Sequence, residues 1–433
     1  MPAVERQLVS ALAHSLHAQN PKIVVISKNA EAIVKSLKEV YPTQASIEAH
    51  STLVTAESAA HADADGLIID QAINEILENV DELEKFVKLA LKLLKYNGIV
   101  IIRQDLSQSK DSKKVAKLTD LFDVYRTEIE GKTTGFAFYS TTEVEDSIHA
   151  HQNWLDFIWS LKKSEFEKVE GNTITFRDFL DKTQYTDTGI YAYEWIFGEN
   201  FISPGGWDEN LRVIRRFGDV KAGQLCLDIG VGIGGGARQF AKEFGARVLG
   251  VDLSANMLSV ALERVQRERD TRISYAICDA LHYKFDENSF DYVFSRDCIQ
   301  HIPDTAALFK RIFHILKPGG KVLITMYGVG YGALSEKFKT YVQQRQYYLK
   351  NLKEIEQLAK SAGFTNIVTE NMTERFKEIL GEERARVENN KAEFLSKFSQ
   401  KEYDSLVNGW NDKLQYIADD NHNWNCFMAQ KPL

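Results

Sequence analysis

The chain has 433 residues, of which 44% are hydrophobic and 26% charged, and its net charge is −8 at neutral pH. This length predicts two domains, and this composition is typical of a soluble globular protein. The negative charge argues against nucleic acid or an anionic membrane as the main partner, and no apolar run reaches the roughly 18 residues of a membrane span.

The start of the chain and its cysteines point to the cytoplasm. The first 25 residues lack the basic, apolar and small-residue order of a secretion signal. The four cysteines show no paired spacing, which is typical of proteins in a reducing compartment. We therefore expect a cytoplasmic protein.

Residues 1–150 are expected to form a first α/β domain. Lys22–Ile26 is predicted to be a strand, residues 30–40 a helix and Gly66–Asp70 another strand. Gly66 is the first glycine of the chain, so no glycine loop can follow the first strand. Bulky side chains there would block the close backbone approach that a cofactor needs. We therefore predict a degenerate domain, used for packing, dimer contact or regulation, and the sequence leaves the oligomeric state open.

The two halves of the chain share a pattern. Residues 89–102 are similar to residues 311–324, and alignment of Asp65 with Asp291 continues the match. An internal duplication of one sheet unit would explain this. Because the match is short and apolar, convergence on α/β patterning is the alternative.

Residues 151–180 are predicted to be a helical linker between the two domains. Charged and aromatic residues recur there at helical spacing. Such a stripe favours a packed connector over a binding site.

Residues 181–433 are expected to form the catalytic domain, whose most informative feature is a glycine loop. A strand at 225–229 runs into Gly230, Gly232 and Gly234, and a helix follows. Glycines allow backbone N–H groups to approach a ligand, and the helix start adds partial positive charge. Asp252 ends the next strand, 22 residues beyond Gly230, where α/β sheets place a carboxylate against ribose hydroxyls. This much fits a nicotinamide dehydrogenase as well as an S-adenosylmethionine enzyme.

Three later strands favour the second reading. Asp279 follows a third strand, residues 290–297 form a fourth, and a Lys-Pro-Gly-Gly turn leads into a fifth at 321–324. This series resembles the class I S-adenosylmethionine-dependent methyltransferases. The resemblance implies two Rossmann-like α/β domains, the second with a mixed seven-stranded sheet ending in strands 364–369 and 423–429. A charged helical insertion at 373–413 is expected to form a lid over the substrate pocket.

Four further segments carry a more specific resemblance, namely Gln184–Gly206, Arg296–His301, Gln344–Tyr347 and Gly409–Lys413. They are similar to the phosphoethanolamine N-methyltransferases of plants, protozoa and nematodes. A degenerate first domain joined to an active second one is most like the second-step enzyme of nematodes. The resemblance implies S-adenosylmethionine as cofactor and a small-molecule phosphobase as substrate. The expected reaction converts phosphomonomethylethanolamine and phosphodimethylethanolamine into phosphocholine, a phospholipid precursor.

This chemistry benefits from a base. An alkylamine with a lysine-like pKa of about 10.4 is protonated at neutral pH, and freeing its lone pair costs about 4 kcal/mol. The resemblance assigns this role to His301, with Tyr185 as its hydrogen-bonded partner and as a latch over the site. From residue types alone, His301 fits equally well as a cap of the following helix.

The substrate phosphate needs charged and polar donors. The resemblance implies Tyr327, Arg345, Tyr347 and Lys413 as its ligands, with Gln184 also in the substrate pocket. Arg345 and Tyr347 lie two residues apart on an expected helix, so a bend or loop is needed for both to reach one phosphate. By itself, Lys413 is more typical of a solvated surface lysine.

The cofactor site is expected to include the three loop glycines and Asp252 at the ribose, with Asp279 near the adenine. The resemblance adds Arg296, Ile202, Ser203 and Tyr193. Tyr193 also fits a core position, because it forms a helical stripe with Ile196 and Phe197. No metal is implied, since the histidines lack carboxylate or thiol partners at ligand spacing.

Two other functions stay open. The same cofactor site fits a methyltransferase for another small amine or a lipid, and both halves also fit a non-catalytic binding protein. The residues do not select among the three methylation steps, because one methyl group in an apolar pocket changes binding by only about 1–3 kcal/mol.

Overall fold

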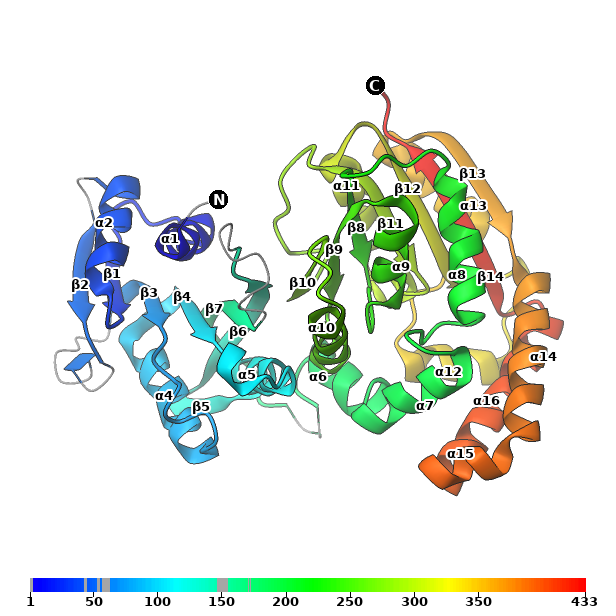
Figure 1. Ribbon diagram of the computed structural model, residues 1–433, viewed down its shortest axis with the longest axis horizontal. Coiled ribbons are helices and arrows are strands. Elements are labelled where there is room, and N and C mark those ends of the chain that lie inside the picture. Colours follow the sequence, from blue (N-terminus) through cyan, green and yellow to red (C-terminus); the bar gives the residue numbers. More distant parts are fainter. Residues whose placement is uncertain are drawn as a thin grey trace. The chain divides into compact units, whose positions relative to one another are not determined.

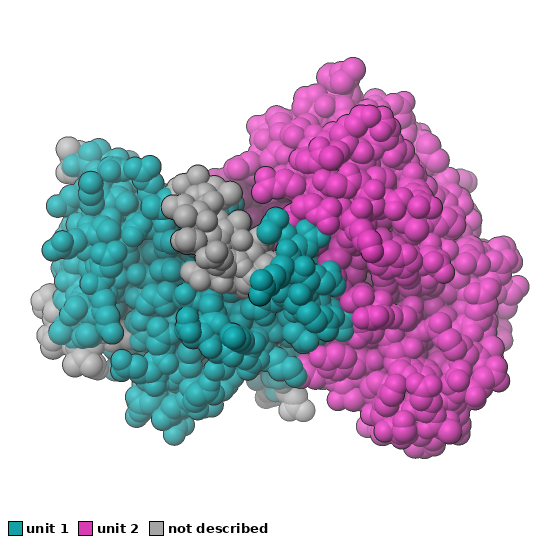
Figure 2. Space-filling model, in the orientation of Figure 1, with its two compact units in different colours: residues 1–184, 254–271, 275–279 teal, residues 185–253, 272–274, 280–433 magenta. Residues whose placement is uncertain are grey.

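The computed structural model is an α/β protein that divides into two compact units (Figures 1 and 2). It describes residues 3–42, 45–52, 55–56, 63–145, 155–169, 171 and 173–433. Unit 1 comprises residues 1–184, 254–271 and 275–279, and unit 2 comprises residues 185–253, 272–274 and 280–433. We call residues 1–150 the first half. Within the described residues, no helix combines the length and apolar composition needed to cross a bilayer.

Unit 1 contains a mixed sheet with the strand order β6-β7-β4-β3-β1-β2. Strands β2, β1, β3 and β4 run parallel, and β7 and β6 add antiparallel pairs. Its elements are α1 (Val4–Ser15), β1 (Lys22–Ile26), α2 (Ala30–Val40), β2 (Ser46–His50), β3 (Ala64–Asp70), α4 (Val80–Leu93), β4 (Leu94–Asp105), α5 (Lys113–Val124), β5 (Arg126–Ile129), β6 (Lys132–Glu143), β7 (Asp156–Glu165), α6 (Phe176–Phe179) and α10 (Ala255–Glu268).

The core of the first half lies between α1, α2 and the parallel strands. Leu8 and Leu12 of α1 belong to one buried cluster with Ile23, Val25 and Ile68 of the sheet. Apolar residues recur in α1 at helical spacing, so burial against the strands stabilises one face of the helix.

The helix predicted for residues 151–180 is wrong over most of its described length. Residues 156–165 form strand β7, which pairs antiparallel with both β4 and β6. Helical structure begins only at Phe176, and residues 151–154, 170 and 172 lie outside the described part. A strand buried on both faces has a continuous apolar run, here Phe157–Trp159, which periodicity does not distinguish from a short helix.

Unit 2 has the strand order β13-β14-β12-β11-β8-β9, and β10 (Ile273–Cys278), whose first two residues belong to this unit, completes the seven strands of the mixed sheet. The lid predicted over 373–413 is helical, as α14, α15 and α16. The other elements are α7 (Asp187–Phe197), α8 (Gly206–Ile214), β8 (Leu225–Ile229), α9 (Gly235–Phe244), β9 (Arg247–Asp252), β11 (Phe290–Arg296), α11 (Thr305–Ile315), β12 (Leu316–Gly328), α12 (Glu336–Arg345), α13 (Leu352–Ala362), β13 (Thr365–Asn371), α14 (Thr373–Asn389), α15 (Lys391–Lys397), α16 (Gln400–Ala418) and β14 (Asn423–Gln430).

The two sheets share both topology and a specific contact, which favours duplication over convergence. In each, four parallel strands are followed by two antiparallel ones in the same order. Asp65 accepts a hydrogen bond from the backbone N–H of Lys22 at 2.8 Å and pairs with Lys95 Nζ at 2.9 Å. Asp291 accepts one from the backbone N–H of Leu225 at 2.9 Å and pairs with Lys317 Nζ at 2.8 Å.

At the carboxyl edge of the first sheet, polar side chains pair with one another. Ser27 follows β1 where the second sheet has its glycine loop, and its hydroxyl donates to Asp70 at 2.9 Å. Arg103 bridges Asp70 at 2.9 Å and Asp156 at 2.6 Å. These groups satisfy each other's charge, which argues against a cofactor site among the described residues of this edge.

Candidate functional site

The loop between β8 and α9 has the backbone that its glycines predict. Gly230, Gly232 and Gly234 have φ values of 76°, 57° and 79°, in the left-handed region. A Cβ atom on Gly230 would overlap Cβ and Sγ of Cys298. The loop therefore requires glycine at this position for both conformation and space.

Asp252 is fixed against this loop. It ends β9, and its carboxylate accepts a hydrogen bond from the backbone N–H of Gly232 at 2.8 Å. The backbone N–H of Gly230 donates to Val251 O at 2.8 Å. The glycine loop and the predicted ribose ligand are thus joined by hydrogen bonds at the carboxyl ends of β8 and β9, where such sheets bind ligands.

Arg296 organises the segment that precedes α8. Its guanidinium is buried and donates to the backbone carbonyls of Pro204 and Gly206. The backbone N–H of Gly205 donates to Glu383 of the lid helix α14 at 2.7 Å. Ile202 and Ser203 lie in this clamped segment, between α7 and α8. Direct contact of Arg296, Ile202 and Ser203 with a cofactor stays a prediction.

His301 lies in a short 3-10 turn after β11 and is buried. Its ring meets the Tyr347 ring edge-on, with the centroids 4.9 Å apart. Burial and the positive charge of Arg345 lower the pKa of His301 to about 4. The alternative helix-cap role is wrong, because Asp304 caps α11 by accepting from the backbone N–H of Ala307.

The predicted phosphate ligands of unit 2 converge on the same turn. The Tyr327 and Tyr347 rings lie 6.0 Å apart, and Lys413 Nζ lies 5.4 Å from the Tyr327 ring centroid. Burial and the Arg345 charge lower the pKa of Lys413 to about 8. Lys413 is therefore not the solvated surface lysine that the sequence by itself suggests. The helical lid brings it from α16 to the end of β12.

The bend required between Arg345 and Tyr347 is present. Helix α12 ends at Arg345, and Gln346 is left-handed with φ 53°. The backbone N–H of Tyr347 then donates to Val342 O at 3.0 Å. This turn allows both side chains to face the His301 side of the cluster.

Two predicted tyrosines join this cluster. Burial raises the pKa of Tyr185 well above its ordinary value, and Tyr347, Asp252 and Cys298 raise it further, so Tyr185 lies near both the acceptor side and the ribose carboxylate. Tyr193 lies beside Arg345, whose pKa it helps to raise, and stacks on Phe197. The structure thus groups Tyr193 with the predicted phosphate ligands. The hydrogen bond predicted between Tyr185 and His301 stays a prediction.

Gln184 and Asp279 belong to unit 1, so their predicted contacts with substrate and cofactor stay predictions. Gln184 ends the helical segment Leu180–Gln184, and Asp279 directly follows β10. Among the described residues, no three His, Cys, Asp or Glu side chains form a group that could hold a metal ion.

Sequence reasoning missed two residues of the cluster. Asp297 is buried and accepts hydrogen bonds from Trp424 Nε1 at 2.7 Å and Thr325 Oγ1 at 2.9 Å, which fix its carboxylate beside Arg296. The Tyr341 ring meets the Tyr347 ring edge-on, with the centroids 5.9 Å apart, and Tyr341 lies one helical turn before Arg345. The i,i+4 spacing on α12 was the available signal for Tyr341; Trp424 and Thr325 come from distant strands and gave none for Asp297.

Replacing Arg345 by glutamine should raise the pKa of His301 from about 4 towards 6.5, because one of the two causes of its depression is removed while burial remains. The imidazolium would then form at higher pH in the variant than in the wild type. Histidine NMR titration measures this directly. Arg384→Gln, which removes an exposed guanidinium on α14, is the control. If His301 has the same pKa in the wild type and in Arg345→Gln, the Arg345 charge is not what lowers that pKa.

Comparisons with known proteins match both halves of the chain. Residues 2–167 match the family model described as phosphoethanolamine N-methyltransferase 2 N-terminal, and residues 227–324 match a methyltransferase domain. Phosphoethanolamine N-methyltransferase 2 of Caenorhabditis elegans is 59% identical over 90% of this chain and 89% of its own length. Phosphoethanolamine N-methyltransferase of Plasmodium falciparum is 34% identical over 59% of this chain and 96% of its own length. Phosphoethanolamine N-methyltransferase 2 of Haemonchus contortus, solved with phosphomonomethylethanolamine and S-adenosylhomocysteine, is 58% identical, with a TM-score of 0.94 and full coverage of both chains.

Proposed function

Because the chain belongs to the phosphoethanolamine N-methyltransferase family, we propose that it methylates phosphomonomethylethanolamine and phosphodimethylethanolamine to give phosphocholine. The chain is an S-adenosylmethionine-dependent methyltransferase of α/β fold, and the alternatives of a non-catalytic protein or another acceptor are not favoured. The observation that carries the substrate assignment is the contact of His301 with Tyr347, in one cluster with Arg345 and Lys413.

The residues present suit the cofactor. Gly230, Gly232 and Gly234 would hold its methionine portion against bare backbone, and Asp252, already oriented by Gly232, would accept from the ribose hydroxyls. When bound, S-adenosylmethionine supplies an electrophilic methyl group on a sulfonium. The protein's own task is therefore to present an uncharged amine and to exclude water.

Phosphate binding and proton removal are coupled in this site. The unliganded His301 is neutral at pH 7, but a pKa of about 4 makes it a weak base. A phosphate dianion held by Arg345 and Lys413 would offset the Arg345 charge and raise the basicity of the imidazole. His301 then accepts the amine proton while Tyr185 closes over the site. Only a phosphorylated amine would therefore make His301 basic enough to accept its proton.

The proposed setting is the cytosol. The four cysteines, all in the described part of the chain, are free thiols, and three are buried. This supports a reducing compartment.

The experiment is to supply S-adenosylmethionine with phosphoethanolamine, its monomethyl and dimethyl forms, and the corresponding dephosphorylated amines, and to identify products by mass spectrometry. We expect phosphocholine from the monomethyl and dimethyl phosphobases and no turnover of the dephosphorylated amines. Lys413→Met should raise KM for the phosphobase by roughly tenfold or more, since a charged hydrogen bond contributes about 1.5–3 kcal/mol. Lys337→Met, which removes an exposed lysine paired with the adjacent Asp412, is the matched control. Equal turnover of the dephosphorylated amines would refute the substrate assignment.

A further inference from the structure

Arg177 joins the first half to the segment that enters the catalytic half. Its side chain is only 2% exposed, and each of its three nitrogens meets a different carboxylate at 2.7 Å. Asp120 and Asp123 come from α5 of the first half, whereas Asp181 lies just before the predicted latch. The side chains of Arg177, Asp123 and Asp181 are buried, whereas that of Asp120 is 44% exposed. Burying these three charges costs solvation, and apolar residues often stabilise a core as well, so we attribute the network to the geometry that it imposes.

Asp181 in turn holds the start of α10. Its carboxylate accepts from the Ser254 hydroxyl and from the backbone N–H of Ala255 at 3.1 Å, and its backbone carbonyl accepts from Asn256 Nδ2 at 3.2 Å. A carboxylate at a helix N-terminus satisfies unpaired N–H groups and complements the helix dipole.

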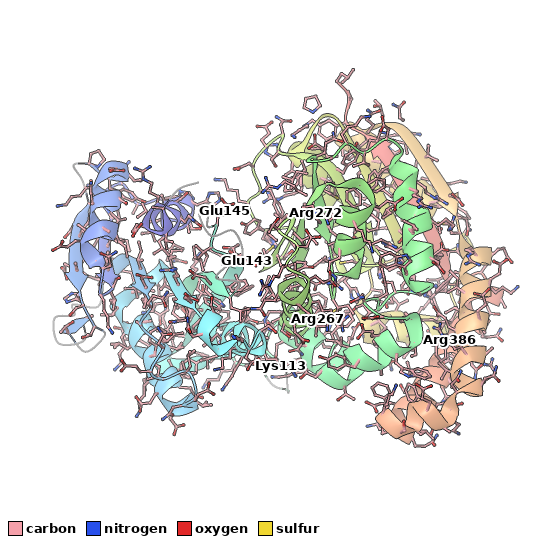
Figure 3. All side chains as sticks on the ribbon, viewed as in Figure 1. Lys113, Glu143, Glu145, Arg267, Arg272 and Arg386 are labelled. Carbon is pink, nitrogen blue, oxygen red and sulfur yellow. The ribbon has the colours of Figure 1, made fainter. Side chains whose placement is uncertain are left out.

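Helices α5 and α10 pack against each other within unit 1. Figure 3 labels Lys113 at the start of α5 and Arg267 near the end of α10, opposite to the ends that the Arg177 network joins. The two helices therefore run antiparallel, and the network fixes one end of the pair.

The first half also holds the end of β10. Ala276, Ile277 and Cys278 pair antiparallel with Thr142, Thr141 and Ser140 of β6. The buried carboxylate of Glu143, labelled in Figure 3, accepts from the backbone N–H of Tyr275 at 2.8 Å. This connection involves other elements of the first half than the Arg177 network does.

Each held segment leads directly into a predicted site residue. Ser254 comes two residues after Asp252, Cys278 immediately precedes Asp279, and Tyr185 comes four residues after Asp181. The ribose carboxylate, the adenine carboxylate and the latch are therefore all adjacent in the chain to backbone that the first half fixes.

We propose that the first half, which has lost its own cofactor loop, is a scaffold that positions the cofactor-binding carboxylates and the latch of the catalytic half, with Arg177 and Asp181 as positioning residues. This rests on the proposed function, because it takes Asp252, Asp279 and Tyr185 as parts of a methyltransferase site. It gives the degenerate domain a role in binding beyond packing.

Asp123→Asn in the full-length chain tests the scaffold, with the affinity for S-adenosylmethionine measured by calorimetry in the absence of an acceptor. We expect affinity to fall roughly five- to tenfold, since small displacements of positioning groups cost binding and rate steeply. Asp181→Asn should lose more cofactor affinity, because Asp181 contacts the start of α10 directly. With phosphobase saturating, KM for the cofactor should rise more than kcat falls.

Asp70→Asn is the matched control, because it removes a carboxylate from a partly buried arginine of the first half, Arg103, whose ion pairs are with Asp70 and Asp156. Its affinity should stay within about twofold of wild type at a temperature where thermal unfolding shows all variants folded. The proposal would be overturned if Asp123→Asn and Asp181→Asn bound S-adenosylmethionine as tightly as the wild type. It would also be overturned if Asp70→Asn lost as much affinity as they do. Should Asp181→Asn fail to fold, Ser254→Ala removes the next contact instead. If the wild-type protein binds the cofactor but does not methylate phosphobases, the proposed function is refuted. The cofactor affinities of the variants can still be compared, so the scaffold proposal is tested separately.

Discussion

His301→Ala should lower kcat by about 10²- to 10⁴-fold while leaving S-adenosylmethionine affinity unchanged. The imidazole is buried against Tyr347 and is neutral at pH 7, so it is available as a proton acceptor, and alanine is not. Without it, the protonated amine must lose its proton to water before attack. Steady-state kinetics with phosphodimethylethanolamine, together with calorimetry of cofactor binding, separate the two effects.

The matched control for this variant is His314→Ala. His314 lies on α11, is about half exposed and has Glu287 within ion-pair distance at 3.7 Å. Its loss should leave kcat and KM unchanged. Unchanged turnover in His301→Ala would remove the base assignment, and loss of cofactor affinity in that variant would reassign His301 to the cofactor side.

Gly230→Ala should weaken S-adenosylmethionine binding by roughly one to two orders of magnitude. At φ 76° an alanine costs about 1–2 kcal/mol of backbone strain, and its Cβ would overlap Cys298. Because the hydrogen bond from Gly230 N–H to Val251 O links this loop to β9, the strain would also displace the ribose carboxylate Asp252. Equilibrium binding of the cofactor measures the effect.

Gly236→Ala is the control from the same glycine run. A Cβ there would meet its nearest neighbours at 3.6 and 3.7 Å, which is ordinary contact, and the residue lies inside α9, where alanine is favoured over glycine. Cofactor affinity should persist in this variant. If Gly230→Ala binds the cofactor as tightly as Gly236→Ala does, the cofactor does not require close approach to the backbone of Gly230.

The degenerate half resembles the catalytic half in architecture but not at its ligand edge. Its sheet keeps the topology of the second one, and Asp65 repeats the contacts of Asp291, yet Ser27 and Arg103 occupy the edge where a cofactor would bind. A domain that no longer binds a cofactor can still hold the backbone of neighbouring segments in place. The binding differences predicted for Asp123→Asn and Asp70→Asn separate this role from general stability.

What could be predicted from the sequence was local. The glycine loop and Asp252 follow from residues a few positions apart, because backbone conformation and strand ends are set by near neighbours. The bend between Arg345 and Tyr347 did not: local residues predicted a helix there, and only the resemblance required a turn. The resemblance supplied His301 and Lys413, which no spacing rule links across more than 100 residues.

The tertiary structure decided what depends on distant partners. Only the pairing of β7 with β4 and β6 made residues 156–165 a strand, since a short apolar run suits either helix or strand until its neighbours are known. Asp297 is oriented by Trp424 and Thr325, and Arg177 by α5, contacts that span between about 28 and 127 residues of chain. Local residues thus determined the loops and their chemistry, whereas long-range packing determined which side chains meet and which half holds them in place.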